Sequence, residues 1–169
     1  VELDLDGAGA TMSVKSGRSN FKLSCLPTSD FPDIGTEELA NSFSIPAADL
    51  RAIIDKTRFA MSTEETRYYL NGIYLHATEE NGVSLLRAVA TDGHRLARFQ
   101  MPLPEGAAGI PGIIVPRKTV GEIRKLLDEA ADTIQIFVSD AKIRFSFDHI
   151  VLTSKLIDGT FPDYQKVIP

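Results

Sequence analysis

The sequence has few of the side chains on which many enzymes depend. Its 169 residues include one cysteine, three histidines and no tryptophan. The lone thiol, Cys25, cannot form an internal disulfide, which fits a reducing compartment, and we expect it to pack as a small apolar side chain. No two histidines have the H-x-x-x-H spacing of a helical zinc site, so we expect neither a metal nor a cofactor.

Long apolar runs and an excess of positive charge are also missing. No apolar run reaches about 18 residues and no signal-peptide pattern is present, so we expect a cytoplasmic protein. The net charge of −5 argues against a simple basic nucleic-acid binder, although positive charge can still be concentrated locally. The sequence begins with valine, and we interpret it as a segment of a longer chain.

What the sequence does contain is repetition. The tripeptide FPD occurs at 31–33 and again at 161–163, and the residues before each copy match without a gap. Further upstream, the alternating apolar residues Leu3, Leu5, Met12 and Val14 match Ile134, Ile136, Ile143 and Phe145. We therefore expect two domains in tandem, of which 1–36 ends the first and 37–169 forms the second.

A shorter repeat lies within the second domain. FSIPAADLRAII (43–54) aligns with IIVPRKTVGEIR (113–124), and in each an apolar stretch runs into a proline, which helices accept in their first turn. Residues at helical spacing follow both prolines, so each segment predicts a strand and then an amphipathic helix. The two stripes are Leu50, Ile53, Ile54 and Thr57, and Val120, Ile123, Arg124 and Leu127.

Three strand candidates follow each predicted helix. They are 67–78, 83–91 and 94–101 in the first set and 133–139, 141–148 and 149–157 in the second. The unit is thus β-α-β-β-β and occurs twice within 43–160, while 1–26 supplies the three strands with which such a unit ends. These patterns predict an α+β fold with antiparallel outer sheets and both helices packed on one side.

Four motifs occur in a fixed order along the chain: RYYLNG (67–72), VATDGHRLA (89–97), IVPRK (114–118) and SKLIDGTFPDY (154–164). Together they resemble the bacterial β sliding clamp, the processivity subunit of the replicative DNA polymerase III. The resemblance covers the end of the family's first domain, at 1–36, and its second, central domain, at 37–169. It implies the DNA-clamp fold, with the helices on the inner face of a homodimeric ring that encircles double-stranded DNA without sequence preference.

The resemblance further implies a non-enzymatic processivity factor with no catalytic site. The matching rings dimerise between their first and third domains, and the third domain is absent here. We therefore expect this segment alone not to form the native dimer.

The resemblance also implies a pocket that captures short linear peptides of DNA polymerase and clamp-loader subunits, with this chain supplying one side. In this sequence that side consists of Leu70, Thr91, Gly93, His94, Arg95, Leu96, Pro162, Lys166 and Val167. The residue types suit the role. Aliphatic side chains and proline offer an apolar cleft, glycine allows a peptide backbone to come close, and arginine and lysine can meet polar groups at the rim.

Contacts with DNA phosphates are expected mainly on the two helices. The windows 47–60 and 117–130 each hold one more basic than acidic residue, so they are the less negative part of an acidic chain. The candidates are Arg51, Arg58, Arg117, Lys118 and Lys125, together with Tyr68 and Tyr69, which match tyrosines on a DNA-contacting loop of the family. Neighbours on a strand face opposite sides, so one of the two tyrosines is expected to pack internally.

Two other interpretations remain open. The same cleft could serve a stand-alone peptide-binding module that encircles nothing. Asp92 and His94 flank a glycine and could form the acid–base pair of a hydrolase, but no nucleophile motif such as G-x-S-x-G accompanies them, and turn or pocket-lining roles fit better. A ring needs sheet edges that pair with neighbouring domains, whereas a stand-alone module has capped edges. The three strands within 1–26 favour the ring.

Overall fold

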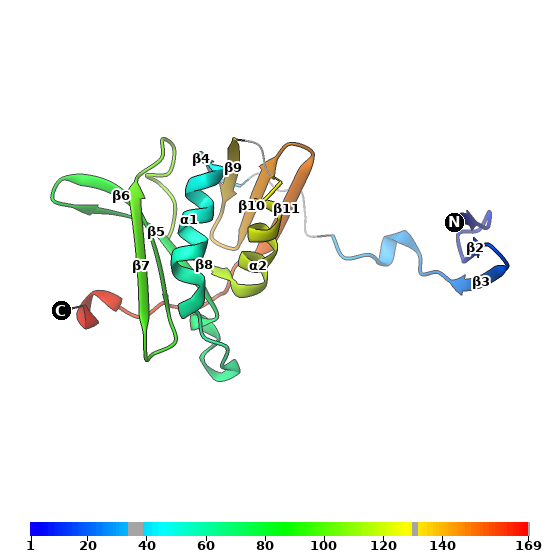
Figure 1. Cartoon of the computed structure of the whole chain (residues 1–169), viewed down its shortest axis with the longest axis horizontal. Helices are drawn as coiled ribbons and strands as arrows, with labels where there is room; N and C mark the ends of the chain where they lie inside the picture. The colour runs from blue at the N-terminus through cyan, green and yellow to red at the C-terminus, as the bar shows by residue number, and fades with distance from the viewer. Residues whose placement is uncertain (34–38, 130–131, 169) are drawn as a thin grey trace. The chain divides into compact units, whose positions relative to one another are not determined.

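The computed structural model describes residues 1–33, 39–129 and 132–168. The chain divides into two compact units, Val1–Thr36 and Glu37–Pro169. The first contains a small sheet and a short 3-10 helix, whereas the second contains two α-helices and the larger sheets (Figure 1).

The N-terminal unit is a three-stranded antiparallel sheet in the order β1-β2-β3. Its elements are β1 (Glu2–Leu5), β2 (Thr11–Ser16), β3 (Ser19–Ser24) and the 3-10 helix η1 (Thr28–Asp30). The three strands expected within 1–26 are therefore present. Cys25 directly follows β3 and is half-buried rather than fully buried as expected.

The strand pairing corrects the residue-to-residue matches that the sequence suggested between the two units. Leu5 lies opposite Met12, whereas Val138 lies opposite Ile143 in the C-terminal unit. With Met12 matched to Ile143, Leu5 therefore corresponds to Val138 rather than to Ile136. The reason is the turn between the paired strands, which spans 6–10 in one unit and only 139–141 in the other.

The C-terminal unit contains, within its described residues, two four-stranded antiparallel sheets and two α-helices, which confirms the expected α+β fold class. One sheet has the order β7-β6-β5-β8, from β5 (Gly72–Glu80), β6 (Val83–Thr91), β7 (Leu96–Pro102) and β8 (Ile113–Pro116). The other has the order β11-β10-β9-β4, from β4 (Asn41–Pro46), β9 (Thr133–Val138), β10 (Lys142–Phe147) and β11 (Ile150–Lys155). The helices are α1 (Ala47–Thr57) and α2 (Arg117–Leu126).

Each half of the internal repeat contributes its first strand to the sheet of the other half. β4 pairs with β9, with Phe43 opposite Ile136, and β8 pairs with β5, with Ile114 opposite Tyr74. The predicted β-α-β-β-β unit therefore occurs twice, but neither copy completes a four-stranded sheet alone.

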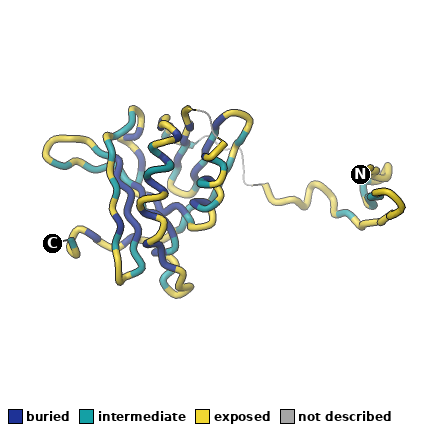
Figure 2. Tube along the Cα trace, viewed as in Figure 1, coloured by how far each residue is buried: buried dark blue, intermediate teal, exposed yellow. Residues whose placement is uncertain are grey.

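Both helices begin directly after the prolines at which the sequence predicted them. Pro46 and Pro116 end their strands and occupy the N-cap positions of α1 and α2. The predicted stripes face the core, since Leu50, Ile53, Ile54, Thr57, Val120, Ile123 and Leu127 are all buried. Arg124 lies at the edge of its stripe and donates to Asp55, which holds the pKa of that carboxyl below its ordinary value. Figure 2 shows the buried trace concentrated on the helices and the strands that they cover.

The tetrapeptide at 67–70 does not begin a strand, contrary to the sequence-based expectation. It belongs to the 3-10 helix η3 (Glu65–Leu70), and β5 begins only at Gly72. Asn71 explains the difference, because its side-chain amide donates to the Glu64 carbonyl at 3.1 Å and its backbone N–H donates to the Tyr68 carbonyl at 3.0 Å. These bonds close a turn that an extended chain cannot make. Two further 3-10 helices are η2 (Arg58–Ala60) and η4 (Tyr164–Val167).

Candidate functional site

Eight of the nine residues expected to bind peptides line one pocket. The pocket has a volume of about 490 Å³ and lies among η3, the loop between β6 and β7, and the C-terminal segment (161–168). It is lined by Arg67, Tyr69, Leu70, Thr91, Gly93, His94, Arg95, Leu96, Pro162, Asp163, Tyr164 and Val167. Lys166 does not line the pocket; its ammonium group instead lies 3.1 Å from the carboxylate of Asp163, which does.

The loop between β6 and β7 is held in place by its own side chains. The Asp92 carboxylate accepts the backbone N–H groups of His94 and Arg95 and the Nε–H of Arg95, each at 3.0 Å. The backbone bonds, first that from His94, lower the pKa of Asp92 to about 2. The Thr91 hydroxyl donates to the Arg95 carbonyl at 2.7 Å and accepts the N–H of Gly93 at 3.1 Å. This side of the pocket is therefore preorganised.

The same bonds argue against the hydrolase interpretation. In an acid–base pair of that type the carboxylate orients the imidazole by a hydrogen bond to the ring. Here the Asp92 carboxylate bonds to backbone and to Arg95 within its own turn, and His94 is exposed. Asp92 holds the loop in shape, and His94 lines the pocket.

Arg67 is a pocket residue that the sequence reasoning missed. Its guanidinium donates to the Glu64 carboxylate through Nε at 2.8 Å and Nη2 at 2.7 Å. The third nitrogen, Nη1, lies over Gly93, where an added Cβ would come within 2.6 Å of it. Gly93 also has a φ of +89°, so its backbone conformation favours glycine, and a side chain there would in addition displace the end of Arg67. The position of Arg67 at the start of the RYYLNG motif was the available signal.

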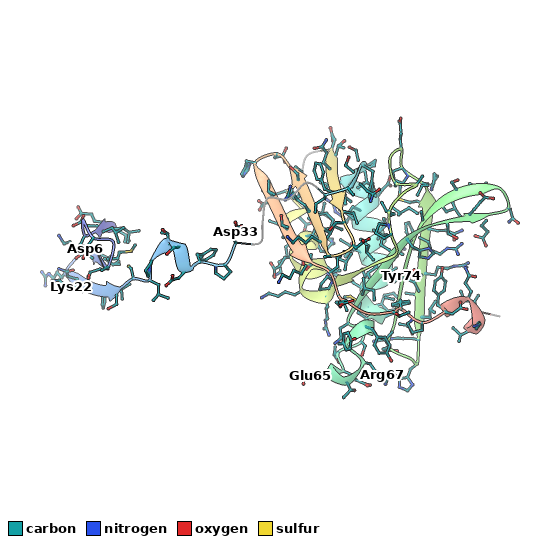
Figure 3. All side chains as sticks on the ribbon, turned by 180° about the vertical axis from the view of Figure 1, so that it is seen from behind. Asp6, Lys22, Asp33, Glu65, Arg67 and Tyr74 are labelled. Carbon is teal, nitrogen blue, oxygen red and sulfur yellow. The ribbon has the colours of Figure 1, made fainter. Side chains whose placement is uncertain are left out.

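The C-terminal segment forms another wall of the pocket. Asp163 and Tyr164 of this segment and Tyr69 of η3 are lining residues that were also missed. Tyr164 and Phe161 belong to a second apolar cluster on the face of the β5 sheet that points away from the helices. Tyr74, which Figure 3 labels, stacks on Phe161 with ring centroids 4.8 Å apart and planes 7° apart. The second FPD motif is thus an anchor, since Phe161 is 9% exposed whereas Phe31 in the first motif is 82% exposed.

Three of the expected DNA contacts are already engaged by neighbouring groups. Arg51 is half-buried and donates to the Leu127 carbonyl at 2.6 Å. Arg58 and Lys125 lie 3.5 Å and 3.1 Å from carboxylates of residues one helical turn away. Phosphate binding by these side chains has to compete with those local bonds.

Arg117 and Lys118 are the more available basic pair. Both are exposed in the first turn of α2, and neither forms an ion pair with another described residue. They border a second pocket of about 460 Å³ together with Thr63, whose exposed hydroxyl can also contact an anion, and Glu122, whose carboxylate pairs with Lys125. Of the expected phosphate contacts, this pair therefore has the most suitable surroundings.

Tyr68 and Tyr69 have different surroundings, and one of the two packs internally, as expected. Tyr68 is exposed, whereas Tyr69 packs against the second apolar cluster and lines the 490 Å³ pocket. Their rings meet edge-on, with centroids 5.7 Å apart and planes 80° apart. The 3-10 helix η3, rather than the alternation of a strand, separates the two side chains.

Residues 44–163 match the family described as the central domain of the DNA polymerase III beta subunit. The chain belongs to this family. It is 53% identical to a beta sliding clamp of Caulobacter vibrioides over 169 residues, which is 100% of this chain and 45% of that protein. The structure of the DnaN sliding clamp of Bartonella birtlesii bound to griselimycin matches this chain with a TM-score of 0.89 at 52% identity. The match covers 99% of this chain and 44% of that one. A sliding clamp structure from Caulobacter crescentus gives a TM-score of 0.88 at 53% identity, over 99% of this chain and 45% of that one.

This member of the beta-subunit family spans less than half the length of the relatives that it matches. The matched central-domain range includes Leu70, Leu96 and Pro162 of the pocket and ends just before Tyr164. Among the described residues, no helix is both long and apolar enough to cross a membrane.

Proposed function

We propose that this chain works within a bacterial sliding clamp, a non-enzymatic ring in the cytoplasm that encircles duplex DNA and holds replication proteins on it. Membership in the DNA polymerase III beta-subunit family and the likeness to solved sliding clamps support the proposal. In it, Val1–Thr36 corresponds to the end of the first clamp domain and Glu37–Pro169 to the second. The ring is a homodimer of the full-length protein, and this segment alone does not form it.

The pocket is where this chain tethers DNA polymerase and clamp-loader subunits, through short linear peptides. The observation that carries this assignment is that eight residues expected to bind peptides, spread from 70 to 167, line one pocket. Leu70, Leu96, Pro162 and Val167 give it apolar surface for large hydrophobic anchors, and Arg67 and Arg95 can meet polar groups at its rim. Lys166 acts only from outside the lining, through Asp163.

DNA binding in this proposal is weak, electrostatic and indifferent to sequence. Arg117 and Lys118 make the main phosphate contacts from this chain, and Tyr68 lies on an exposed surface that can follow the duplex. A closed ring needs little affinity, because its hold on DNA is topological and each tethered partner rebinds before it diffuses away.

The test of the pocket is an NMR titration of this chain with a short peptide that ends in Leu-Phe, alongside a scrambled peptide. We expect shifts confined to residues 67–70, 91–96 and 161–167. Val167→Asp should weaken binding about tenfold, because it places a charge in the apolar cleft. Val167 is 70% exposed, so the fold should tolerate the change.

Val151→Asp is the matched control, since Val151 is 64% exposed on β11 and lies outside the pocket. It should leave affinity unchanged within error. Equal loss in both variants, or shifts spread over the surface, would remove the peptide-docking assignment.

A further inference from the structure

A row of four rings fixes the C-terminal segment to the β5 sheet. Phe161 and Tyr164 come from the segment, and Tyr74 and His76 come from one face of β5. Tyr74 stacks on both Phe161 and His76 with centroids 4.8 Å apart, and His76 lies 5.8 Å from Tyr164. Since Tyr164 also lines the peptide pocket, the row connects β5 directly to the pocket wall.

The hydrogen bonds along this row fit a neutral His76 with its hydrogen on Nδ1. The Ala77 carbonyl, 3.1 Å from Nδ1 of His76, can only accept, so Nδ1 carries a hydrogen. Arg87 Nη1, 3.3 Å from the Tyr164 hydroxyl oxygen, can only donate. The Tyr164 proton is therefore free to go to Nε2 of His76, which lies 2.9 Å away. This arrangement requires a neutral imidazole.

The charged groups around His76 also oppose its protonation. Arg87 lies directly across from it on β6 and is buried, and its guanidinium binds Glu80 at 2.8 Å and Gln100 at 2.8 Å. The other facing titratable groups are the hydroxyls of Tyr74 and Tyr164. Burial first, and Arg87 in addition, lower the pKa of His76.

We propose that His76 is a positioning residue for the peptide pocket: its neutral imidazole holds the Tyr164 hydroxyl, and protonation of the imidazole releases the pocket's C-terminal wall. A proton on Nε2 turns the acceptor of the Tyr164 hydrogen bond into a donor. The phenol oxygen then faces two cationic donors, and the Tyr164 proton loses its partner. The inference deepens the proposed function and rests on it for the peptide readout.

The direction of the pH effect follows from the lowered pKa. The stabilising contribution of neutral His76 is complete above the ordinary histidine pKa of about 6.5 and declines as the pH falls below that value. Peptide affinity should be constant between pH 7 and 8 and should fall as the pH passes below the lowered pKa of His76 in the folded protein.

The experiment measures affinity for an amidated Leu-Phe peptide without titratable side chains, over a pH series from 8.0 down to the most acidic value at which the protein stays folded. All proteins carry His94→Gln, because His94 is a second histidine and lines the pocket. In this background we expect affinity to drop at least about threefold at the acidic end of the series, as one lost hydrogen bond predicts. Adding His76→Gln, whose amide oxygen can still accept from Tyr164, should remove the pH dependence and keep affinity at pH 8.0 within about twofold. His149→Gln, at the exposed turn before β11, should change neither value.

A second readout does not depend on peptide binding. NMR signals of the Tyr164 ring and the Val167 methyl groups in the free protein should shift with pH in the His94→Gln background and stay fixed once His76→Gln is added. A pH dependence of affinity or of these signals that survives His76→Gln overturns the positioning role. Failure of the peptide to bind at any pH, with the ring signals still following His76, overturns the proposed function instead.

Discussion

The two sheets of the C-terminal unit follow one plan, yet among the described residues an outer layer covers only the β5 sheet. Strand registers counted from the two prolines place Tyr74 and Gln135 at equivalent positions, and likewise Val89 and Ser146. The apolar member of each pair lies under the C-terminal segment, and the polar member faces solvent on the other sheet. The duplicated backbone therefore does not determine which of the two sheets is covered on its outer face. A few side chains determine which sheet the C-terminal segment covers.

The same comparison shows that two equivalent arginines differ in burial. Arg87 and Arg144 occupy equivalent positions, and each donates from Nε to the residue opposite, Gln100 at 3.0 Å and Thr153 at 3.3 Å. Arg87 is 3% exposed beneath the C-terminal segment, whereas Arg144 is only half-buried. Duplication preserved the hydrogen bond, and the added layer turned one copy into a buried network that reaches Tyr164.

The largest expected effect comes from exchanging the paired side chains. Val89→Ser should lower the free energy of unfolding by about 3 kcal/mol, because it removes two methyl groups from a fully buried site and buries a hydroxyl. Ser146→Val, the reciprocal change on the other sheet, should stay within about 0.5 kcal/mol. Urea denaturation of both variants gives the comparison, and equal losses would mean that the outer layer contributes nothing specific.

Arg87→Met should have the next largest effect, a loss of about 2 kcal/mol in the free energy of unfolding. The change removes a buried guanidinium that donates to Gln100, Glu80 and the Tyr164 hydroxyl, while Tyr164 keeps its bond to His76 and Glu80 can still reach water. Arg144→Met is the control and should cost less than about 0.5 kcal/mol. Thermal unfolding of the two variants side by side decides whether burial, rather than the shared bond, sets the difference.

The smallest effect concerns the turns that join the equivalent strands. The loop 92–95, between β6 and β7, contributes residues to the pocket. The equivalent turn between β10 and β11 consists of Asp148 and His149. Because the native pKa of Asp92 is depressed, its contribution to stability is present above the ordinary value of about 3.9 and is lost as the pH falls towards 2. Carbon-detected NMR should give a midpoint near 2.

Arg95→Met sharpens that measurement. The backbone bonds from residues 94 and 95 remain, so the pKa of Asp92 should rise only slightly and stay below its ordinary value. A return to the ordinary value would show that the guanidinium, rather than the backbone, organises the loop.

Much of the fold could be predicted from periodicity and proline. Pro46 and Pro116 marked both strand-to-helix junctions, and strand 83–91 was predicted with the bounds that β6 has. The start of β5 was wrong because the turn around Asn71 depends on a side-chain bond to the Glu64 carbonyl, which hydrophobic pattern does not reveal. The exchange of β4 and β8 between sheets was not predicted, since partner choice between strands far apart leaves no local pattern.

The candidate pocket came from motif resemblance, and its residue types alone would not have defined it. Leu96 and Val167 are ordinary aliphatic side chains until the fold brings their segments together. Tyr164 was missed because its role depends on His76, which lies on another segment and had no recognisable motif. Arg58 and Lys125 were selected by charge, and their local carboxylate partners emerged only from helix geometry.

The exchanged strands have a consequence for how this chain folds. β4 pairs with β9, which follows it by most of the length of the C-terminal unit. The backbone groups along the edge of β4 therefore stay unpaired until β9 is in place. Such long-range closure slows folding and makes both halves assemble in one cooperative step. During synthesis the edge of β4 leaves the ribosome well before its partner, so the nascent chain passes through a period with an unpaired strand, in which chaperone protection matters most.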